Sequence, residues 1–282
     1  MILIADSGST KTDWVLIGQG TENSFKTIGF NPYFIDTAAI QKELTSRLTP
    51  SLEASAVNEV YFYGAGCSNS LNVGIVEAAL KHCFPNAKLF VGHDMLAAAR
   101  ALLGDEPGFA AIIGTGSNTC IYNGSQVSAN IDSLGYLLGD EGSGSYIGKK
   151  IVRDYLRGYL PPVLDADFRN KYNDLTPAGV FDALYNKPLP NRYLAAFCMF
   201  ADQHKEHAYI REIVRTSFHD FFKNLVSGYP GYQQYSFNCI GSVASTFKDI
   251  LEEVAGTFKM KVGRIINSPI ADLVRYHLRA SQ

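Results

Sequence analysis

The sequence predicts an α/β protein of two domains, each built from a mixed sheet with flanking helices. Strand-like and helix-like segments alternate along most of the 282 residues, and such alternation is typical of a sheet covered by helices. A short motif of Gly, Ser and Thr between two strand-like segments also occurs twice, at 4–12 and at 112–120. The second copy, offset by 108 residues, suggests that one structural unit is repeated.

Composition supports two domains and excludes some partners. The chain is 46% hydrophobic and 18% charged, which is enough to bury two medium-sized cores. Its formal net charge is -2, so it has no general electrostatic attraction for nucleic acid or for an anionic membrane. We therefore expect neither as a partner.

The cysteines and the apolar runs indicate a cytoplasmic protein. Five cysteines are scattered along the chain without a CxxC pair, which argues against a disulfide framework and against a zinc finger. The first apolar run, 2–5, is stopped by Asp6 and has no basic region before it, unlike a signal peptide. No apolar stretch approaches the roughly 18 residues that a membrane span requires.

The first half reads as alternating strands and helices. Segments 2–5 and 14–17 are strand-like and flank a hydroxyl-rich turn. Asp36 precedes a helical stretch in which Ile40, Leu44 and Leu48 recur at i, i+4 spacing. The segments that follow are a strand at 59–64, a helix at 73–84, a strand at 88–92 and a helix at 95–104.

The domain boundary is predicted near residue 106. Turn-forming residues occupy 104–108, and a new strand starts over at 109–114. We therefore expect an N-terminal domain at 1–106 and a C-terminal domain at 107–282. The second half is more helical, with amphipathic helices at 144–160, 209–228 and 268–280, one late strand at 235–241, and prolines at 161–162 and 186–191 around a helical insertion. The last helix can pack back on the first domain.

The segment Asp6-Ser7-Gly8-Ser9-Thr10-Lys11-Thr12 is not a Walker loop. That motif needs Gly before the Lys and a helix after it, whereas here Thr10 precedes Lys11 and the strand-like "DWVLI" follows. The segment instead predicts a tight β-hairpin whose backbone N–H groups can hold an anion. Asp6 is suited to orient a hydrated Mg²⁺, although an ordinary hairpin built from turn-forming residues remains an alternative.

The second copy of the motif strengthens the anion-binding interpretation. Two similar hairpins, one in each domain, can hold a triphosphate from both sides, and only one of them needs a carboxylate for the metal. This agrees with Asp6 in the first copy and Gly114 in the second. We therefore expect Gly8 and Gly116 to face each other across an interdomain cleft.

The ordered set of motifs resembles the sugar kinase, Hsp70 and actin superfamily. Within it, the chain is similar to the N-acetylglucosamine kinase-like branch, which is grouped with the BadF/BadG/BcrA/BcrD ATPases. The motifs are "DSGSTKTD" (6–13), "GFNPY" (29–33), "VGHDMLAAA" (91–99), "IIGTGSNT" (112–119), "GDEGSGSYIG" (139–148) and "NCIGSVAS" (238–245). The resemblance covers essentially the whole chain and implies two ribonuclease H-like (actin-like ATPase) domains around a cleft.

The resemblance implies that ATP and Mg²⁺ are cofactors. Asp6 would hold the Mg²⁺ through water. The residues that would contact the nucleotide are Gly8, Ser9, Thr10 and Lys11 in the first phosphate motif, Thr115, Gly116 and Ser117 in the second, and Gly241 and Ser242 in the adenosine motif.

The resemblance also implies a sugar site. Asp94 would be the general base that accepts the proton of the attacking hydroxyl; an N-cap for the following helix is the alternative role from its position alone. The other residues implied at the sugar are Asn31, Gly66, Cys67, Thr115, Leu134, Gly135 and Asp140. Leu134 stands where some relatives carry an aromatic residue, so we expect the sugar ring or its N-acetyl group to be held differently here, and the substrate can be an N-acetylated or a free amino sugar.

The leading interpretation is an ATP-dependent kinase for N-acetylglucosamine or glucosamine. One alternative is the activator ATPase of 2-hydroxyacyl-CoA dehydratases, whose iron–sulfur cluster needs suitably placed cysteines; 139–148 contains none. The other is a sugar sensor without catalysis, which the presence of Asp6, Asp94, Thr115 and Asp140 disfavours. A homodimer is expected by analogy.

Overall fold

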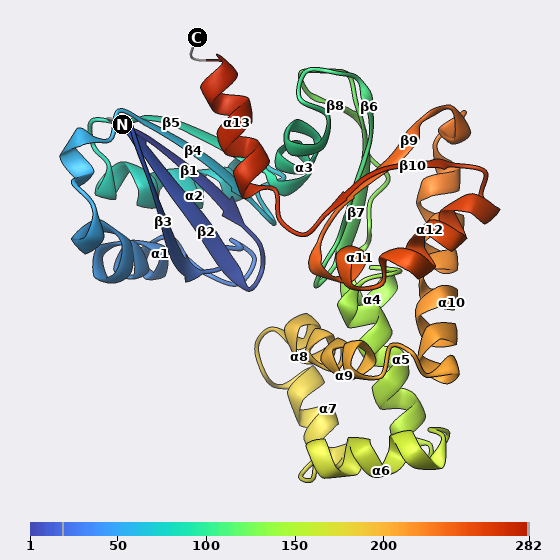
Figure 1. The fold of residues 1–282 in the computed structure, drawn as a ribbon. Coiled ribbons are helices and arrows are strands. Elements are labelled where there is room, and N and C mark those ends of the chain that lie inside the picture. Colours follow the sequence, from blue (N-terminus) through green and yellow to red (C-terminus); the bar gives the residue numbers. More distant parts are fainter. Residues whose placement is uncertain (19, 281–282) are drawn as a thin grey trace. The chain divides into compact units, whose positions relative to one another are not determined.

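The computed structural model describes residues 1–18 and 20–280 and consists of two compact units (Figure 1). Unit 1 comprises Met1–Glu106, Gly124–Gln126 and the segment from Ser268 onward. Unit 2 comprises Pro107–Asn123 and Val127–Asn267. The last helix is therefore part of unit 1, although it follows unit 2 in the sequence.

The sheet of unit 1 has five strands in the order β3-β2-β1-β4-β5. Strands β1, β2 and β3 form an antiparallel meander, and β4 and β5 run parallel to β1. The bounds are Ile2–Ser7 (β1), Lys11–Gly18 (β2), Thr21–Ile28 (β3), Glu59–Gly64 (β4) and Lys88–His93 (β5). Because β1, β4 and β5 are parallel, their carboxyl ends meet at one edge of the sheet, where ligands of open α/β sheets bind.

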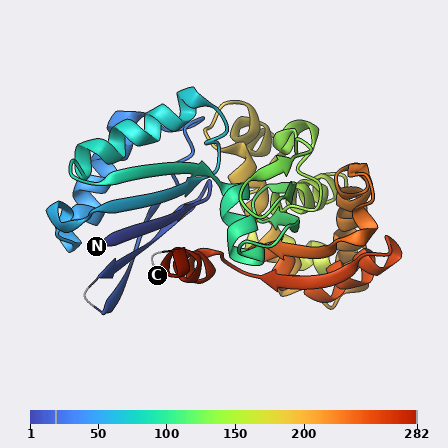
Figure 2. The same ribbon diagram turned by 90° about the horizontal axis from the view of Figure 1, so that it is seen from above.

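Helices cover both faces of this sheet. The red helix α13 (Ile270–Ala280) lies on one face and the cyan helix α2 (Ser70–Cys83) on the other (Figure 2). Helix α1 (Thr37–Glu43) packs beside α2, and α3 (Asp94–Leu103) packs against α13. The core on the α1 and α2 side contains Trp14, Phe30 and Phe62, all fully buried.

Unit 2 repeats the topology of unit 1. Its sheet has the order β10-β9-β6-β7-β8, in which β6, β7 and β8 are antiparallel and β9 and β10 are parallel to β6. The bounds are Gly108–Ile113 (β6), Ser117–Tyr122 (β7), Val127–Ala129 (β8), Ser236–Ile240 (β9) and Lys261–Ile266 (β10). The repeat predicted from the two motifs is thus confirmed as a repeat of strand order.

The two hairpins differ in detail. Ser7 pairs with Thr12 across the first, whereas Ile113 pairs with Ser117 across the second. The first turn is therefore one residue longer, and the residues that match in the motif do not occupy matching places in the two ladders. Asp6 still lies within β1, while its motif counterpart Gly114 is the first turn residue after β6.

Three strands escaped the sequence analysis, namely β3, β8 and β10. The expectation of a single late strand was wrong, because β10 follows β9 and pairs with it. All three lie at or beside a sheet edge, and most of their side chains are exposed or only half-buried. They consequently lack the regular apolar alternation by which a strand is recognised.

The helices of unit 2 pack on its sheet and on one another. Helices α5 (Gly144–Leu156), α10 (Ala208–Asn224) and α12 (Lys248–Thr257) contribute to a core with Phe109, Phe218 and Phe222. The remaining helices are α4 (Gly135–Leu138), α6 (Pro162–Lys171), α7 (Pro177–Tyr185), α8 (Pro190–Ala196), α9 (Cys198–Gln203) and α11 (Ser242–Thr246). Where α5 crosses α8, a Cβ on Gly148 would overlap the Leu194 carbonyl oxygen, so this crossing needs glycine.

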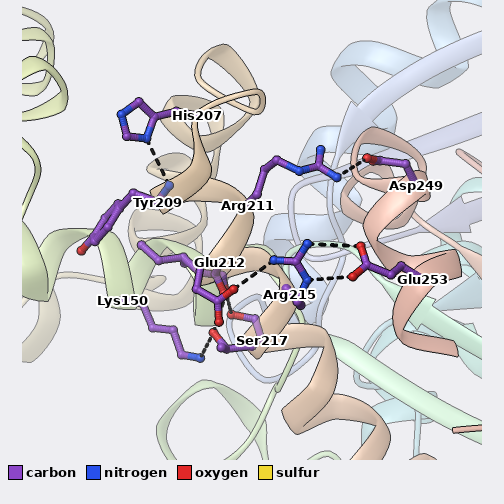
Figure 3. A network of polar contacts seen from close by, with 11 residues as sticks. Lys150, His207, Tyr209, Arg211, Glu212, Arg215, Ser217, Asp249 and Glu253 are labelled. Carbon is purple, nitrogen blue, oxygen red and sulfur yellow. Dashed lines mark hydrogen bonds and ion pairs between the residues drawn. The ribbon is translucent and has the colours of Figure 1, made fainter. Parts of the chain in front are cut away.

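Ion pairs join α10 to α12 on the surface of unit 2 (Figure 3). The Arg211 guanidinium lies 2.7 Å from the Asp249 carboxylate, and Arg215 forms two hydrogen bonds to Glu253. His207 caps the start of α10 through its Nδ1 atom, 3.2 Å from the Tyr209 nitrogen. Exposed pairs contribute only about 0–1 kcal/mol each, so the network orients the helices more than it stabilises them. Within the described part of the chain, no helix has both the length and the apolar character needed to cross a membrane.

Candidate active site

The first turn is held by the segment that follows β3. The Gly29 nitrogen donates to the Thr10 carbonyl at 3.1 Å, and the Phe30 nitrogen donates to Ser7 Oγ at 2.9 Å. A Cβ on Gly29 would overlap the Gly8 carbonyl oxygen and the backbone of Ser9. The glycine therefore lets one stretch of backbone lie directly on the other and fixes the shape of the turn.

Asn31 connects this turn to the loop after β4. Its amide nitrogen donates to Ser9 Oγ at 3.2 Å, and its Oδ1 atom accepts from the Tyr33 nitrogen at 3.1 Å. Gly66, with a φ of +81°, packs so closely that a Cβ there would overlap Asn31 Oδ1. The structure thus brings together Ser9, Asn31 and Gly66, which lie in three separate segments of the sequence.

The loop after β4 is anchored by the start of α2. Asn72 donates from its side chain to the Gly66 carbonyl at 2.8 Å, and Asn69 caps the helix by accepting from the Asn72 nitrogen. Cys67 in the same loop is buried, and burial raises the pKa of its thiol to about 12, with the Asp94 charge adding to the effect. Cys67 is therefore a neutral thiol close to Asp94.

Asp94 is the first residue of α3, at the carboxyl end of β5. The cap of that helix is His93, whose Nδ1 accepts from the Leu96 nitrogen at 3.3 Å, so the N-cap role considered for Asp94 was wrong by one residue. Asp94 Oδ1 accepts from the Met95 nitrogen at 2.8 Å. Burial raises the pKa of the Asp94 carboxyl, while His93 opposes the shift.

Asp6 lies near the carboxyl end of β1, at the same end of the sheet as Asp94. The charges of Asp94, Asp13 and Lys11 all act on its carboxyl group. Asp6 is directly opposite Asp13 in the β1–β2 ladder. Burial raises its pKa to about 7, the charges of Asp94 and Asp13 add to the shift, and Lys11 opposes it. Lys11 is itself engaged by Asp13, with a distance of 2.6 Å between Nζ and Oδ2.

The Asp6 region suits a divalent cation. A cation bound between carboxylates that repel one another stabilises their ionised forms, and Mg²⁺ takes carboxylate oxygens as ligands. No group of three His, Cys, Asp or Glu side chains among the described residues is arranged to hold a metal ion. The donors present fit Mg²⁺ that is bound through one or two carboxylates and takes water and phosphate oxygens for the remainder.

In unit 2, the second turn is held by the first two residues of α5 and by Asp140 just before that helix. The Gly144 nitrogen donates to the Gly114 carbonyl at 2.8 Å, and the Ser145 nitrogen donates to the Thr115 carbonyl at 3.1 Å. The Ser117 nitrogen donates to Asp140 Oδ1 at 3.1 Å. A Cβ on Gly116 would come within 2.9 Å of that carboxylate oxygen.

Asp140 is held in an unusual backbone conformation. Its φ is +55°, in the left-handed region, and the residue is 7% exposed. Burial raises the pKa of its carboxyl to about 6, while the hydrogen bond from the Ser117 nitrogen lowers it. A costly conformation combined with a buried carboxylate is typical of a functional position.

Leu134 and Gly135 lie just before Asp140, at the start of α4. Both have positive φ, and Leu134 is 59% exposed. Lys149 of α5 holds the segment by donating from Nζ to the Tyr136 carbonyl at 3.0 Å. The exposed Leu134 side chain is available for contact with a ligand or with another part of the protein.

The predicted adenosine motif adjoins the second turn. Gly241 has a φ of +139°, and a Cβ there would overlap the Ile113 carbonyl oxygen at the end of β6. Its nitrogen donates to the Ile266 carbonyl at 2.9 Å. Ser242 begins α11 and is exposed. Unit 2 therefore brings its predicted nucleotide residues to the carboxyl ends of β6 and β9.

Comparison with solved structures decides the family. The chain aligns over 100% of its length, and 100% of the other chain's, with a "putative N-acetylglucosamine kinase" from Porphyromonas gingivalis. The sequence identity is 39% and the TM-score is 0.94. This chain belongs to the N-acetylglucosamine kinase-like family of carbohydrate kinases.

More distant structures share the fold of this family. A "putative N-acetylglucosamine kinase" from Chromobacterium violaceum has 17% identity and a TM-score of 0.71, with 98% of each chain covered. A ROK family glucokinase from Streptomyces griseus, solved in complex with glucose and AMPPNP, has 14% identity and a TM-score of 0.55, with 98% of this chain and 97% of that chain covered. No protein-family model and no curated protein matched the chain.

The kinase-like architecture gathers the predicted residues into two groups. In unit 1 the group is Asp6, Gly8, Ser9, Thr10, Lys11, Asn31, Gly66, Cys67 and Asp94. In unit 2 it is Thr115, Gly116, Ser117, Asp140, Gly241 and Ser242, with Leu134 and Gly135 at the start of α4. Gly8 and Gly116 belong to different units, and the expectation that they face each other remains a prediction.

Sequence reasoning missed several residues that shape this kinase-like site. Asp13 faces Asp6, Asn72 anchors the Gly66 loop, and Ser7 bonds to Thr12 with 2.7 Å between their hydroxyl oxygens. Asp13 could have been predicted from the sequence, because residues two apart in a strand lie on the same face and Asp13 therefore shares a face with Lys11. The role of Asn72 could not be predicted from the sequence, because its hydrogen-bond partner is the backbone carbonyl of Gly66, which any residue type supplies.

Proposed function

We propose that the protein transfers the γ-phosphoryl group of ATP to a hydroxyl of an amino sugar, N-acetylglucosamine or glucosamine. The observation that carries this proposal is the placement of Asp94 and Asp6 in one electrostatic cluster beside the first turn. A base and a metal-binding carboxylate next to an anion-binding turn are the parts that phosphoryl transfer requires. The relative from Porphyromonas gingivalis, 39% identical, supports the substrate class.

Asp94 is the proposed general base. Its position as the first helical residue of α3 fixes its backbone, and its Oδ1 atom is held by the Met95 nitrogen. The other carboxylate oxygen is left to accept the proton of the sugar hydroxyl as the hydroxyl attacks the γ-phosphorus. A raised pKa suits this task, because a base whose pKa is nearer the working pH takes the proton more effectively.

The two turns are the proposed phosphate-binding elements. In the first, Gly8 and Thr10 are exposed and Lys11 supplies a positive charge; in the second, Thr115 and Gly116 are half-buried. We propose that they bind opposite sides of one triphosphate, as the repeated topology suggests. Mg²⁺ near Asp6 would neutralise phosphate oxygens when bound. The glucokinase of the same fold, solved with AMPPNP, supports a nucleotide ligand.

Asn31 and Asp140 are the proposed sugar ligands. Asn31 is already oriented by Ser9 and Tyr33, and Asp140 by Ser117. Groups held in this way lose little freedom when the substrate binds, and so they favour a single pose of the attacking hydroxyl. Binding between two such groups would also exclude water that otherwise hydrolyses ATP.

A coupled ADP-release assay tests the proposal. The panel is N-acetylglucosamine, glucosamine, muramic-acid derivatives and glucose, each with ATP and Mg²⁺. We expect ADP release that depends on an amino sugar and is lost in Asp94→Asn. Asp36→Asn is the matched control, because Asp36 caps α1 and Asn caps a helix equally well; it should keep full activity.

Other outcomes would identify the alternatives. ADP release that no sugar affects, together with a coloured protein after anaerobic purification, would indicate the dehydratase activator. All five cysteines are buried, and burial raises the pKa of the Cys198 thiol to about 12. Sugar binding without any ADP release would indicate a sensor.

A further inference from the structure

The start of α5, together with Asp140 just before it, is bonded to the second turn at three points. Gly144 and Ser145 donate to the Gly114 and Thr115 carbonyls, and the Ser117 nitrogen donates to Asp140 Oδ1. Two of these are backbone bonds, and the third joins the turn to a side chain implied at the sugar. The turn and Asp140 cannot shift independently without breaking one of these bonds.

We propose that Asp140 is a positioning residue for the nucleotide as well as a sugar ligand, and that it couples the binding of the two. One oxygen of its carboxylate fixes the Ser117 N–H and with it the second turn. The other oxygen is left for a sugar hydroxyl. The inference rests on the proposed function, because it takes Asp140 to contact the sugar and the second turn to contact the nucleotide.

The surroundings of Asp140 leave it little freedom. Its own nitrogen donates to the Ser133 carbonyl at 2.9 Å, and its carbonyl accepts from the Ser143 nitrogen at 3.1 Å. The carboxylate also packs against Gly116, where a Cβ would lie 2.9 Å from Oδ1 and 3.1 Å from Oδ2. Movement of the carboxylate therefore requires movement of the turn.

Coupling follows from this shared carboxylate. A sugar hydroxyl that donates to the second oxygen holds the carboxylate in the position that fixes the Ser117 N–H. The nucleotide then meets a turn that is already ordered and binds more tightly. By thermodynamic linkage, bound nucleotide must increase the affinity for the sugar by the same factor. We expect the ADP dissociation constant to fall about tenfold when sugar is saturating, within the range usual for coupled sites.

The first test measures ADP binding without sugar. Asn at 140 keeps an oxygen that accepts from the Ser117 nitrogen and tolerates positive φ, so Asp140→Asn should bind ADP within about twofold of the parent. Asp140→Ala loses the acceptor and should bind ADP about tenfold more weakly. Glu141→Gln is the control, because Glu141 Oε1 accepts from Asn224 at 2.8 Å instead of holding the turn. An Asp140→Ala protein that binds ADP as well as the parent, or better, would overturn the proposal.

The second test measures N-acetylglucosamine binding without nucleotide. Gly116→Ala puts a methyl group against the Asp140 carboxylate, whereas Gly114→Ala points into open space. We expect Gly116→Ala to bind the sugar about tenfold more weakly and Gly114→Ala to bind it within about twofold of the parent. Equal sugar affinities in the two variants would contradict the coupling. Circular dichroism confirms that each variant is folded.

The two tests separate this inference from the proposed function. A protein that binds ADP but none of the sugars would contradict the proposed substrate class. The ADP affinities of the Asp140 variants would still decide whether this carboxylate positions the turn. Conversely, sugar-dependent ADP release together with sugar and ADP affinities that are independent of each other would preserve the kinase and overturn the coupling.

Discussion

Asp6 of β1 and Asp13 of β2 face each other directly across the first hairpin. Burial raises the pKa of the Asp6 carboxyl to about 7, and the negative charges of Asp94 and Asp13 add to this shift. An acid with a raised pKa binds its proton more tightly in the folded state, so its contribution to stability is present at low pH and is lost as the pH rises through the folded pKa. When both Asp6 and Asp13 are ionised, their repulsion lowers the free energy of unfolding, and a bound cation can offset this loss.

Asp6→Asn should therefore stabilise the protein while removing its activity. We expect the free energy of unfolding at pH 8 to rise by about 1–2 kcal/mol, a figure reduced for partial exposure. The gain should disappear below about pH 4, where the parent carboxylate is protonated in both states. Urea unfolding at pH 4, 6 and 8 measures this. A loss of stability at pH 8 would contradict the electrostatic description.

Mg²⁺ should raise the melting temperature of the parent at pH 8 but not that of Asp6→Asn. The reason is that Asp6→Asn lacks the carboxylate whose repulsion the ion relieves, whereas the parent and Asp36→Asn keep it. Differential scanning fluorimetry with and without MgCl₂ measures the shift. Asp36→Asn, at an exposed helix cap, controls for the loss of a carboxylate elsewhere. An equal shift in all three proteins would place the ion away from Asp6.

Asp94→Asn should lower kcat by about 10²–10⁴-fold. Asn preserves the hydrogen bond from the Met95 nitrogen but cannot accept a proton from the sugar. ADP affinity should stay within about twofold of the parent, because the loss concerns the chemical step. Steady-state kinetics and ADP titration together check this. A loss confined to KM would instead make Asp94 a binding residue.

The activity should fall on the acid side at a pH well above the ordinary range for Asp. Burial raises the pKa of Asp94, and the pKa values of Asp6 and Asp140 are raised to about 7 and about 6. The base must be ionised to act, so kcat/KM should rise with pH as these groups lose protons. A kcat/KM that is constant from pH 5 to pH 8 would contradict the assigned base.

Gly29→Ala should destabilise unit 1 strongly, by about 2–4 kcal/mol. Its Cβ would overlap the backbone of the first turn, where no flexible side chain can move away. Gly74→Ala is the matched control, because Gly74 lies exposed within α2 with nothing within 4 Å of its Cβ position. That change should stabilise by about 0.5–1 kcal/mol through helix propensity. Thermal unfolding of both variants would show opposite signs.

The sequence predicted the inner strands better than it predicted the edge strands. Asp6 and Asp94 lie at the carboxyl ends of β1 and β5, two strands that the sequence predicted, whereas Asn31 follows β3, and the roles of all three residues remain predictions. Strands β3, β8 and β10 were missed because edge strands expose polar side chains on both faces. The contacts of Asp140 with Ser117 could not be predicted either, since they depend on a positive φ that its neighbours in the sequence do not specify.

The most direct test of the central claim is identification of the product. The protein is incubated with ATP, Mg²⁺ and N-acetylglucosamine or glucosamine, and the sugar is analysed by mass spectrometry and ³¹P NMR. The proposal predicts a sugar that has gained one phosphoryl group in the parent and in Asp36→Asn, with almost none in Asp94→Asn. Unmodified sugar in the presence of ADP release, or equal phosphorylation by Asp94→Asn, would contradict it.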